Sequence, residues 1–263
     1  MTITHFPARE LTAFPADLVA GGLVIGGFPV RIAQSTADLQ QVHALRRARF
    51  LPDGQAKSDR DRFDSLCVHL MVSDPDGAQL LATARLRLVT QGAAFPDTYT
   101  AQFYDLSAVA RHYARALEIG RLCQVEHADN MPDALRALLA GVTLVVLHAN
   151  VDLMFGCTSF RGQDVARHRL ALAWLKANHL GPAALLPGSI HPRASNLPDE
   201  IVDPQAARQA LPALLRMYLG MGGWVSDLAI TDPELDTVHV FTAVATAAIP
   251  LARLRALRAL CPV

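Results

Sequence analysis

The central strand of the fold is predicted by the stretch ALEIGRLCQV, residues 116–125. Its apolar residues are typical of a buried strand, yet it also contains Glu118 and Arg121. A carboxylate that is buried alone is costly, so Glu118 must be paired or functional. From this strand alone, a structural ion pair with Arg121 or Arg85 and a functional role are equally favoured.

Strands and helices are predicted in mixed order on both sides of this strand. The stretch Asp74-Pro75-Asp76-Gly77 is a turn sequence between two apolar runs, which is typical of an antiparallel hairpin. Ser35 is a suitable N-cap for the helix that follows it. The remaining apolar patterns predict strands at 21–32, 66–72, 80–89, 152–160, 224–230 and 238–245, and helices at 132–148, 164–179, 207–219 and from 250 onward.

This order of elements predicts an α/β (α+β) fold. A hairpin followed by strand–helix–strand units favours a mixed, mostly antiparallel central sheet with helices on both faces. We expect a single domain over residues 1–263, with a core at about 21–181 and a C-terminal extension at about 182–263 that begins in a proline-rich loop.

The composition excludes several classes of protein. Hydrophobic residues make up 51% of the chain and charged residues 18%, which excludes a disordered chain. The chain has 24 basic and 24 acidic residues, and this zero net charge argues against a nucleic-acid partner. No segment predicts a membrane span or a secretory signal, so we expect a cytoplasmic protein. The ten histidines and four cysteines show no metal-ligand spacing, and no metal site is predicted.

Several charged residues and one aromatic residue follow one another in an informative order along the first half of the chain. They occur in the order Arg46, Phe50, Asp61, Asp64, Arg85, Glu118 and Arg121. This order resembles the pattern of the acyl-homoserine-lactone synthases, which have a GNAT-like fold and transfer an acyl chain to an amine. The aromatic residue expected shortly after Phe50 is missing, which counts against a homoserine-lactone product.

Four longer stretches resemble a related family more closely, the bacterial L-ornithine N(alpha)-acyltransferases. They are LEIGR (117–121), LMFGCTSF (153–160), YLGMGGWVSD (218–227) and HVF (239–241). The resemblance covers roughly residues 40 to 260. It implies that a (3-hydroxy) fatty acyl chain passes from acyl carrier protein to the α-amine of L-ornithine, the step that forms lyso-ornithine lipid.

The sequence also bears on the acyl donor. GNAT enzymes that use coenzyme A hold its pyrophosphate in a turn of the form QxxGxG or RxxGxG after the central strand. After Val125 this chain reads EHADNMP, residues 126–132, without such a turn. Acyl carrier protein is therefore favoured over coenzyme A, and no cofactor is expected beyond the acyl-carrier-protein co-substrate.

The resemblance implies a role for each motif residue. Glu118 is the expected catalytic base, because an α-ammonium must lose a proton before its nitrogen can attack a thioester. Gly120 is expected to bulge the strand, since residues 118 and 121 of a regular strand point to opposite faces. The expected supporting residues are Arg121, Arg85, Asp61, Asp64, Arg46 and Phe50, and the weak candidates for reading the acceptor side chain are Asp227 and Asp232.

Other interpretations remain open. Without the resemblance, Asp61 and Asp64 read as a solvated loop, and Arg85 as part of a solvated sheet face. The same chemistry on another amino acid, glutamine first, is the nearest alternative function, and a homoserine-lactone synthase is next. A non-catalytic GNAT-fold binder of acyl chains or carrier protein represents a different class. The mean hydropathy of +0.23 predicts peripheral contact with lipid at the inner face of the cytoplasmic membrane.

Overall fold

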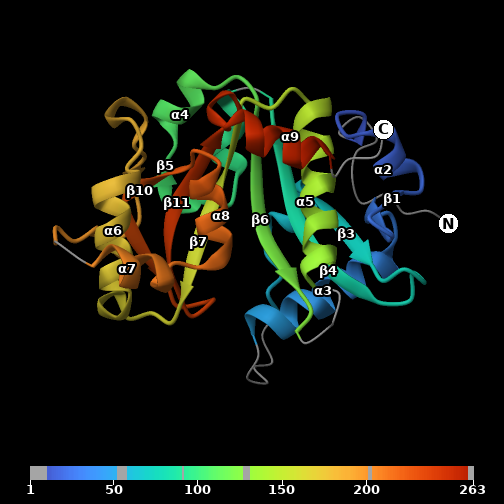
Figure 1. Ribbon diagram of the computed structural model, residues 1–263, viewed down its shortest axis with the longest axis horizontal. Coiled ribbons are helices and arrows are strands. Elements are labelled where there is room, and N and C mark those ends of the chain that lie inside the picture. The colour runs from blue at the N-terminus through green and yellow to red at the C-terminus, as the bar shows by residue number, and fades with distance from the viewer. Residues whose placement is uncertain (1–10, 52–57, 91, 127–130, 201–202, 260–263) are drawn as a thin grey trace. The chain divides into compact units, whose positions relative to one another are not determined.

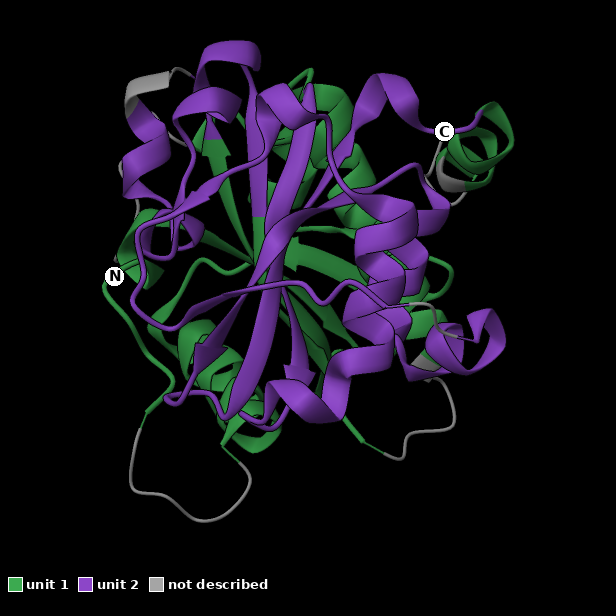
Figure 2. Cartoon of the chain, turned by 90° about the vertical axis from the view of Figure 1, so that its left-hand side faces the viewer, with its two compact units in different colours: residues 1–88, 119–151, 251–263 green, residues 89–118, 152–250 purple. Residues whose placement is uncertain are grey.

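The computed structural model describes residues 11–51, 58–90, 92–126, 131–200 and 203–259 (Figure 1). The chain divides into two compact units, and each is assembled from separate stretches (Figure 2). Unit 1 comprises residues 1–88, 119–151 and 251–263, and unit 2 comprises residues 89–118 and 152–250. The expected division into a core and a C-terminal extension stays a prediction.

Unit 1 is an antiparallel sheet with helices. Its strands lie in the order β1, β2, β3, β4 and then the larger part of β6, and the β1–β2, β2–β3 and β3–β4 pairs are antiparallel. The predicted hairpin is confirmed by the β3–β4 pair. The elements are α2 (Ala16–Ala20), β1 (Leu23–Ile25), β2 (Phe28–Ile32), α3 (Thr36–Phe50), η1 (Asp64–Leu66), β3 (Val68–Ser73), β4 (Leu80–Val89), β6 (Ala116–Gln124), α5 (Met131–His148) and α9 (Leu251–Ala259).

Local signals explain where the first elements begin and end. The Ser35 side chain accepts the Asp38 N–H at 3.1 Å and the Asp38 carboxylate accepts the Ser35 N–H at 3.0 Å, which confirms the predicted helix start as a capping box. The prediction of one strand over 21–32 is wrong. Gly26 and Gly27, with φ of 60° and 91°, form a turn that separates β1 from β2.

Helices cover both faces of the unit 1 sheet. Successive strand residues point to opposite faces, and β3 is buried along its whole length. Leu70 faces α5, where a Cβ added to Gly141 would lie 2.9 Å from its side chain. Met71 points the other way and packs in one cluster with Val42 and Leu45 of α3. The expected arrangement of helices on both faces is therefore confirmed within this unit.

Unit 2 has a mixed sheet. Its strands lie in the order β6, β7, β11, β10 and β9; the first three residues of β6 pair in parallel with β7, and the other pairs are antiparallel. The elements are η2 (Gly92–Asp97), η3 (Thr100–Gln102), β5 (Tyr104–Asp105), α4 (Ser107–His112), β7 (Leu153–Arg161), η4 (Val165–His168), α6 (Arg169–His179), η5 (Ala183–Leu185), β8 (Gly188–Ser189), β9 (Ala194–Asn196), α7 (Pro204–Ala210), α8 (Ala213–Gly220), β10 (Trp224–Asp232), β11 (Thr237–Ala245) and η6 (Thr246–Ala248).

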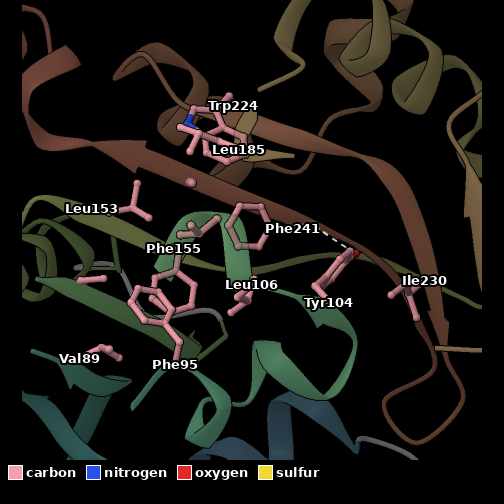
Figure 3. Close-up of a cluster of buried hydrophobic side chains, with 13 residues drawn as sticks. Val89, Phe95, Tyr104, Leu106, Leu153, Phe155, Leu185, Trp224, Ile230 and Phe241 are labelled. Carbon is pink, nitrogen blue, oxygen red and sulfur yellow. Dashed lines mark hydrogen bonds between the residues drawn. The ribbon is translucent and has the colours of Figure 1, made fainter. Parts of the chain in front are cut away.

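The two faces of this sheet carry different layers. One face buries Phe155 and Phe241 against side chains of the 89–113 segment, among them Phe95 and Tyr104 (Figure 3). The other face packs β-strand residues such as Val240 against α6 and α8. The 89–113 segment had no predicted elements, and the structure shows that it covers one face of the sheet.

Two predicted helices are each divided in the structure. The helix expected at 164–179 begins as the short 3-10 helix η4, which Asp164 caps, and continues as α6. The helix expected at 207–219 is two helices, because Pro212 cannot continue α7 and instead stands at the N-cap of α8 with ψ of 141°.

Candidate active site

Arg46 is the centre of a buried charge cluster in unit 1. It lies on α3 with a side chain that is 0% exposed. Its Nε donates to Asp59 Oδ2 at 2.6 Å, and one terminal nitrogen donates to Asp64 Oδ1 at 2.7 Å. The other terminal nitrogen reaches the Asp59 carbonyl oxygen at 3.2 Å. Because a guanidinium is a rigid fork, these contacts fix the loop that carries both carboxylates.

Asp61 and Asp64 connect the other two arginines of the cluster. One terminal nitrogen of Arg85 lies 2.6 Å from Asp61 Oδ1 and 2.8 Å from Asp64 Oδ1. A terminal nitrogen of Arg121 lies 3.1 Å from Asp61 Oδ2. Although burial raises the pKa of Asp64, the hydrogen bond and charge of Arg46, with Arg85, hold it well below its usual range. The expected pairing of the two aspartates with arginines is therefore observed, and the solvated-loop interpretation is wrong.

The irregularity expected in the central strand falls one residue later than predicted. Arg121 has a φ of 49°, in the left-handed region, whereas Gly120 does not. A Cβ at Gly120 would meet only Arg85 Nε, at an ordinary 3.9 Å, so no close approach requires glycine there. The Arg121 guanidinium also lies 5.9 Å from the centre of the Phe50 ring. Its ion pairs hold the side chain in place and so stabilise a backbone conformation that is uncommon for arginine.

His69 is a buried imidazole beside this cluster. It pairs with Arg85 across β3 and β4, and neither ring nitrogen has a hydrogen-bond partner among the described residues. Burial, together with the charge of Arg46, lowers its pKa to about 3. The imidazole is therefore neutral at neutral pH, and protonating it costs stability.

We expect the free energy of unfolding to fall as the pH drops from about 6.5 towards 4. The unfolded chain binds a proton at His69 in this range while the folded chain does not, so the loss over these roughly 2.5 pH units is at most about 3 kcal/mol. Denaturant unfolding at several pH values measures it. The fall should be smaller in His69→Leu, and an unchanged slope in that variant would contradict the assignment. Asp64 does not interfere, because its contribution is lost only below about pH 4, where unfolded aspartates begin to protonate.

Glu118 lies in unit 2 and is 4% exposed. Its Oε1 accepts the backbone N–H of Thr100 at 2.7 Å, and its Oε2 accepts that of Tyr99 at 3.1 Å. An ionised carboxylate has about four lone-pair sites, so these two bonds leave further acceptor capacity. Glu118 therefore anchors the start of η3. The sequence predicted either a base or an ion pair for this residue, and it did not predict this anchoring role.

Tyr99 also reaches one of the two acceptor candidates. Its hydroxyl donates to Asp232 Oδ2 at 3.3 Å, and Asp232 is 5% exposed. Asp227, on the same strand, is half-buried, and its carbonyl oxygen accepts the Leu197 N–H at 2.8 Å. The structure therefore connects Asp232, through Tyr99, to Glu118.

A histidine lies near Asp232 on the neighbouring strand. His239, in β11, is 1% exposed, and its Nδ1 lies 3.4 Å from the Tyr104 hydroxyl. Its ring meets Phe103 edge to face, with 4.7 Å between ring centres. Burial lowers the pKa of His239 to about 4. HVF was only a sequence match, and no role for His239 was predicted.

The structure thus gathers most of the predicted residues into two sets, each within its own unit, and no described side-chain contact joins Asp227 to either set. Sequence reasoning missed three contributors. Asp59 belongs to the charge cluster, and its place in a run of charged residues was the available signal. Tyr99 and Thr100 bind Glu118 through backbone N–H groups, for which side-chain identity gives no signal.

The described ranges contain neither a metal-binding group of side chains nor a membrane-spanning helix. No three or more His, Cys, Asp or Glu residues there are grouped so that they could hold a metal ion. None of the helices in those ranges is both long and apolar enough to cross a membrane.

Known proteins show similarity along most of the chain. A family model described as an acetyltransferase (GNAT) domain matches residues 41–130. The L-ornithine N(alpha)-acyltransferase of Rhodobacter capsulatus is 31% identical over 229 residues, covering 81% of this chain and 88% of that protein. The enzyme of the same name from Brucella abortus is 30% identical over 237 residues, covering 82% and 84%. A solved N-acyl amino acid synthase from uncultured soil microbes matches 86% of this chain and 98% of its own at 10% identity, with a TM-score of 0.48.

Proposed function

Because the chain belongs to the L-ornithine N(alpha)-acyltransferase family, we propose that it moves a fatty acyl chain from acyl carrier protein to the α-amine of L-ornithine. The product would be lyso-ornithine lipid. The observation that carries the chemistry is Glu118, a buried carboxylate that retains acceptor capacity beside its two backbone bonds. A buried carboxylate of this kind is suited to take a proton from an ammonium.

The proposed reaction exchanges one bond for another. Glu118 takes a proton from the α-ammonium, and the neutral nitrogen attacks the thioester carbonyl carbon. When the tetrahedral intermediate collapses, the C–N bond remains and the C–S bond breaks. The thiolate leaves and takes up the second proton of the attacking nitrogen. One acyl thioester and one amine thus give one amide and one thiol, and the first proton passes from Glu118 to solvent.

Acyl carrier protein is the proposed donor for two reasons. The sequence after Val125 has no glycine-rich turn of the kind that holds the pyrophosphate of coenzyme A. Unit 2 also exposes arginines suited to an acidic partner, and these are Arg111, Arg115, Arg161, Arg167 and Arg169. No cofactor is part of the proposed reaction.

The charge cluster of unit 1 has a proposed scaffold role. Arg46, Arg85 and Arg121 each contact a carboxylate of the loop that contains Asp61 and Asp64. Charges that are paired with one another in this way are suited to hold a loop in one conformation. Phe50 adds a contact to Arg121 from α3. We assign these residues to ordering the loop and none of them to proton transfer.

An acceptor panel tests the proposed function. Purified protein is mixed with acylated carrier protein and ornithine, glutamine or homoserine derivatives, and free thiol and product mass are measured. We expect thiol release and an acylated product with ornithine above all others. Acylated glutamine as the main product would identify glutamine, the nearest alternative, as the acceptor. The absence of thiol release with every acceptor would favour the non-catalytic binder.

Weak membrane contact is a further part of the proposal. The mean hydropathy of +0.23 and the amphipathic product favour contact with lipid, and the zero net charge offers little electrostatic attraction. We expect reversible, low enrichment on vesicles in a flotation assay. An equal distribution with and without vesicles, in the presence of carrier protein, would contradict this contact.

A further inference from the structure

Asp232 is a buried carboxylate without a cationic partner among the described residues of its own unit. Its Oδ1 accepts the backbone N–H groups of Glu234 at 2.9 Å and Leu235 at 3.3 Å, and its Oδ2 accepts the Tyr99 hydroxyl at 3.3 Å. It forms no ion pair with any residue that the structure describes in unit 2. Neutral donors satisfy its lone pairs in part, but a buried negative charge is stabilised far more by a cation.

His239 offers a second unused acceptor on the same face of the sheet. Its Nε2 is buried and has no hydrogen-bond partner among the described residues of the unit. Burial also keeps the imidazole neutral, because it lowers the pKa to about 4. A neutral imidazole has one N–H donor and one lone-pair acceptor, so the tautomer decides what Nε2 can bind.

The contacts of Tyr104 favour the tautomer in which Nε2 is the acceptor. The Tyr104 hydroxyl accepts the Phe241 N–H at 3.1 Å, the dashed line in Figure 3, and donates to the His239 carbonyl oxygen at 3.2 Å. Its single proton is then engaged, so His239 Nδ1, at 3.4 Å, carries a proton and donates to the hydroxyl oxygen. The lone pair on Nε2 is left without a donor.

The register of β10 and β11 brings the two acceptors together. Ile230 lies opposite His239, and Asp232 lies opposite Thr237. Residues two apart on a strand share a face, so Asp232 and His239 are diagonal neighbours on one face of the sheet. Such neighbours have backbones about 7–8 Å apart. At that separation, one small cationic group can reach both a carboxylate and an imidazole.

We propose that Asp232 and His239 form the subsite that holds the distal ammonium of a diamino-acid acceptor. The ammonium has three N–H donors, of which one can bond to the carboxylate and one to Nε2. This subsite rests on the proposed function, because it reads the side chain of the same acceptor whose α-amine reacts.

Tyr99 sets the distance between the two ends of this acceptor. Its backbone N–H binds Glu118 and its hydroxyl binds Asp232, so this single residue spans the distance between the two carboxylates. A diamino acid carries one amine for each of them, the α-amine for Glu118 and the distal ammonium for Asp232. Glutamine has a neutral amide at that end, and an amide would leave the buried charge of Asp232 uncompensated.

The test compares ornithine with norvaline, which has the same carbon chain without the distal amine. We expect Asp232→Asn and His239→Leu to lower kcat/KM for ornithine by roughly 10- to 100-fold, the usual value of a hydrogen bond to a charged group. Most of the loss should lie in KM. Turnover of norvaline should change much less, and His239→Gln, which keeps an acceptor near Nε2, should restore most of the ornithine preference.

Controls separate this subsite from the function on which it rests. His179→Leu removes a half-buried histidine that packs on Trp174 of α6, on the other face of the sheet, and should leave the ornithine-to-norvaline ratio unchanged. Equal losses for both acceptors in Asp232→Asn and His239→Leu would overturn the subsite and leave the function standing. If the wild-type protein acylates neither acceptor, the proposed function fails and the subsite fails with it.

Discussion

Glu118→Gln is expected to lower kcat by roughly 10²–10⁴, the usual contribution of a positioned base. Glutamine keeps the shape of the side chain but cannot take a proton from the α-ammonium. The gap to the wild-type rate should narrow at high pH, because more of the acceptor amine then arrives already neutral. Turnover at several pH values, measured with saturating ornithine, checks this. A variant with near-normal turnover at neutral pH would exclude Glu118 as the base.

The structure requires a stability control for this variant. Both Glu118 oxygens accept backbone N–H groups, so the NH₂ of glutamine must face one of these donors, at a cost of about 1–3 kcal/mol. Asp38→Asn is a control for lost stability, since Asp38 also accepts two backbone N–H groups, those of Gln34 and Ser35 on Oδ2, and its Oδ1 pairs with Arg31 at 2.6 Å. That variant should lose stability too, while its kcat stays within a few-fold of wild type. A comparable loss of turnover in both variants would point to destabilisation instead of lost chemistry.

Arg46→Met is expected to lower the free energy of unfolding by about 3–5 kcal/mol, the usual cost of removing one partner from a buried ion pair. Methionine has a similar length but leaves the Asp59 and Asp64 carboxylates without their 2.6 Å and 2.7 Å contacts. Asp59 is itself almost fully buried, so water cannot replace the lost donor. Urea denaturation at neutral pH measures the change.

A surface pair provides the reference for this measurement. Arg136 and Asp133 form an ion pair 2.6 Å long on α5 with both side chains more than half exposed. Arg136→Met should therefore change the free energy of unfolding by less than about 1 kcal/mol. Similar losses in Arg46→Met and Arg136→Met would mean that the buried cluster contributes no more than a surface pair.

Local signals account for the parts of the fold that the sequence predicted well. Ser35 and the Asp74–Gly77 turn act within a few residues of themselves, so the capped helix and the hairpin follow directly from them. Pro212 was a signal of the same kind, and it divides the helix expected over 207–219. The family resemblance, in turn, indicates one set of residues, and the contacts confirm it as a cluster of Arg46, Asp61, Asp64, Arg85 and Arg121.

Contacts made by the backbone or between distant segments could not be predicted. Glu118 binds Tyr99 and Thr100, 19 and 18 residues away, through N–H groups that every non-proline residue has. The Tyr99 hydroxyl meets Asp232 across 133 residues. The left-handed backbone of Arg121 is another such case. Glycine adopts this conformation most readily, so the sequence favours the neighbouring Gly120 for it. In each case tertiary packing decides the conformation.

The choice of arginine for every cation in the unit 1 cluster has a consequence for work in alkaline solution. Guanidinium groups stay charged far above the range in which a lysine would lose its proton. Although burial lowers the pKa of Arg85, the neighbouring Asp61 charge raises it overall above its ordinary value. The amine of an acceptor becomes a better nucleophile as the solution is made more basic. The arginine cluster keeps its positive charges under those same conditions. A rise in rate with alkaline pH therefore reflects deprotonation of the acceptor amine, and the loop that the cluster orders stays in place.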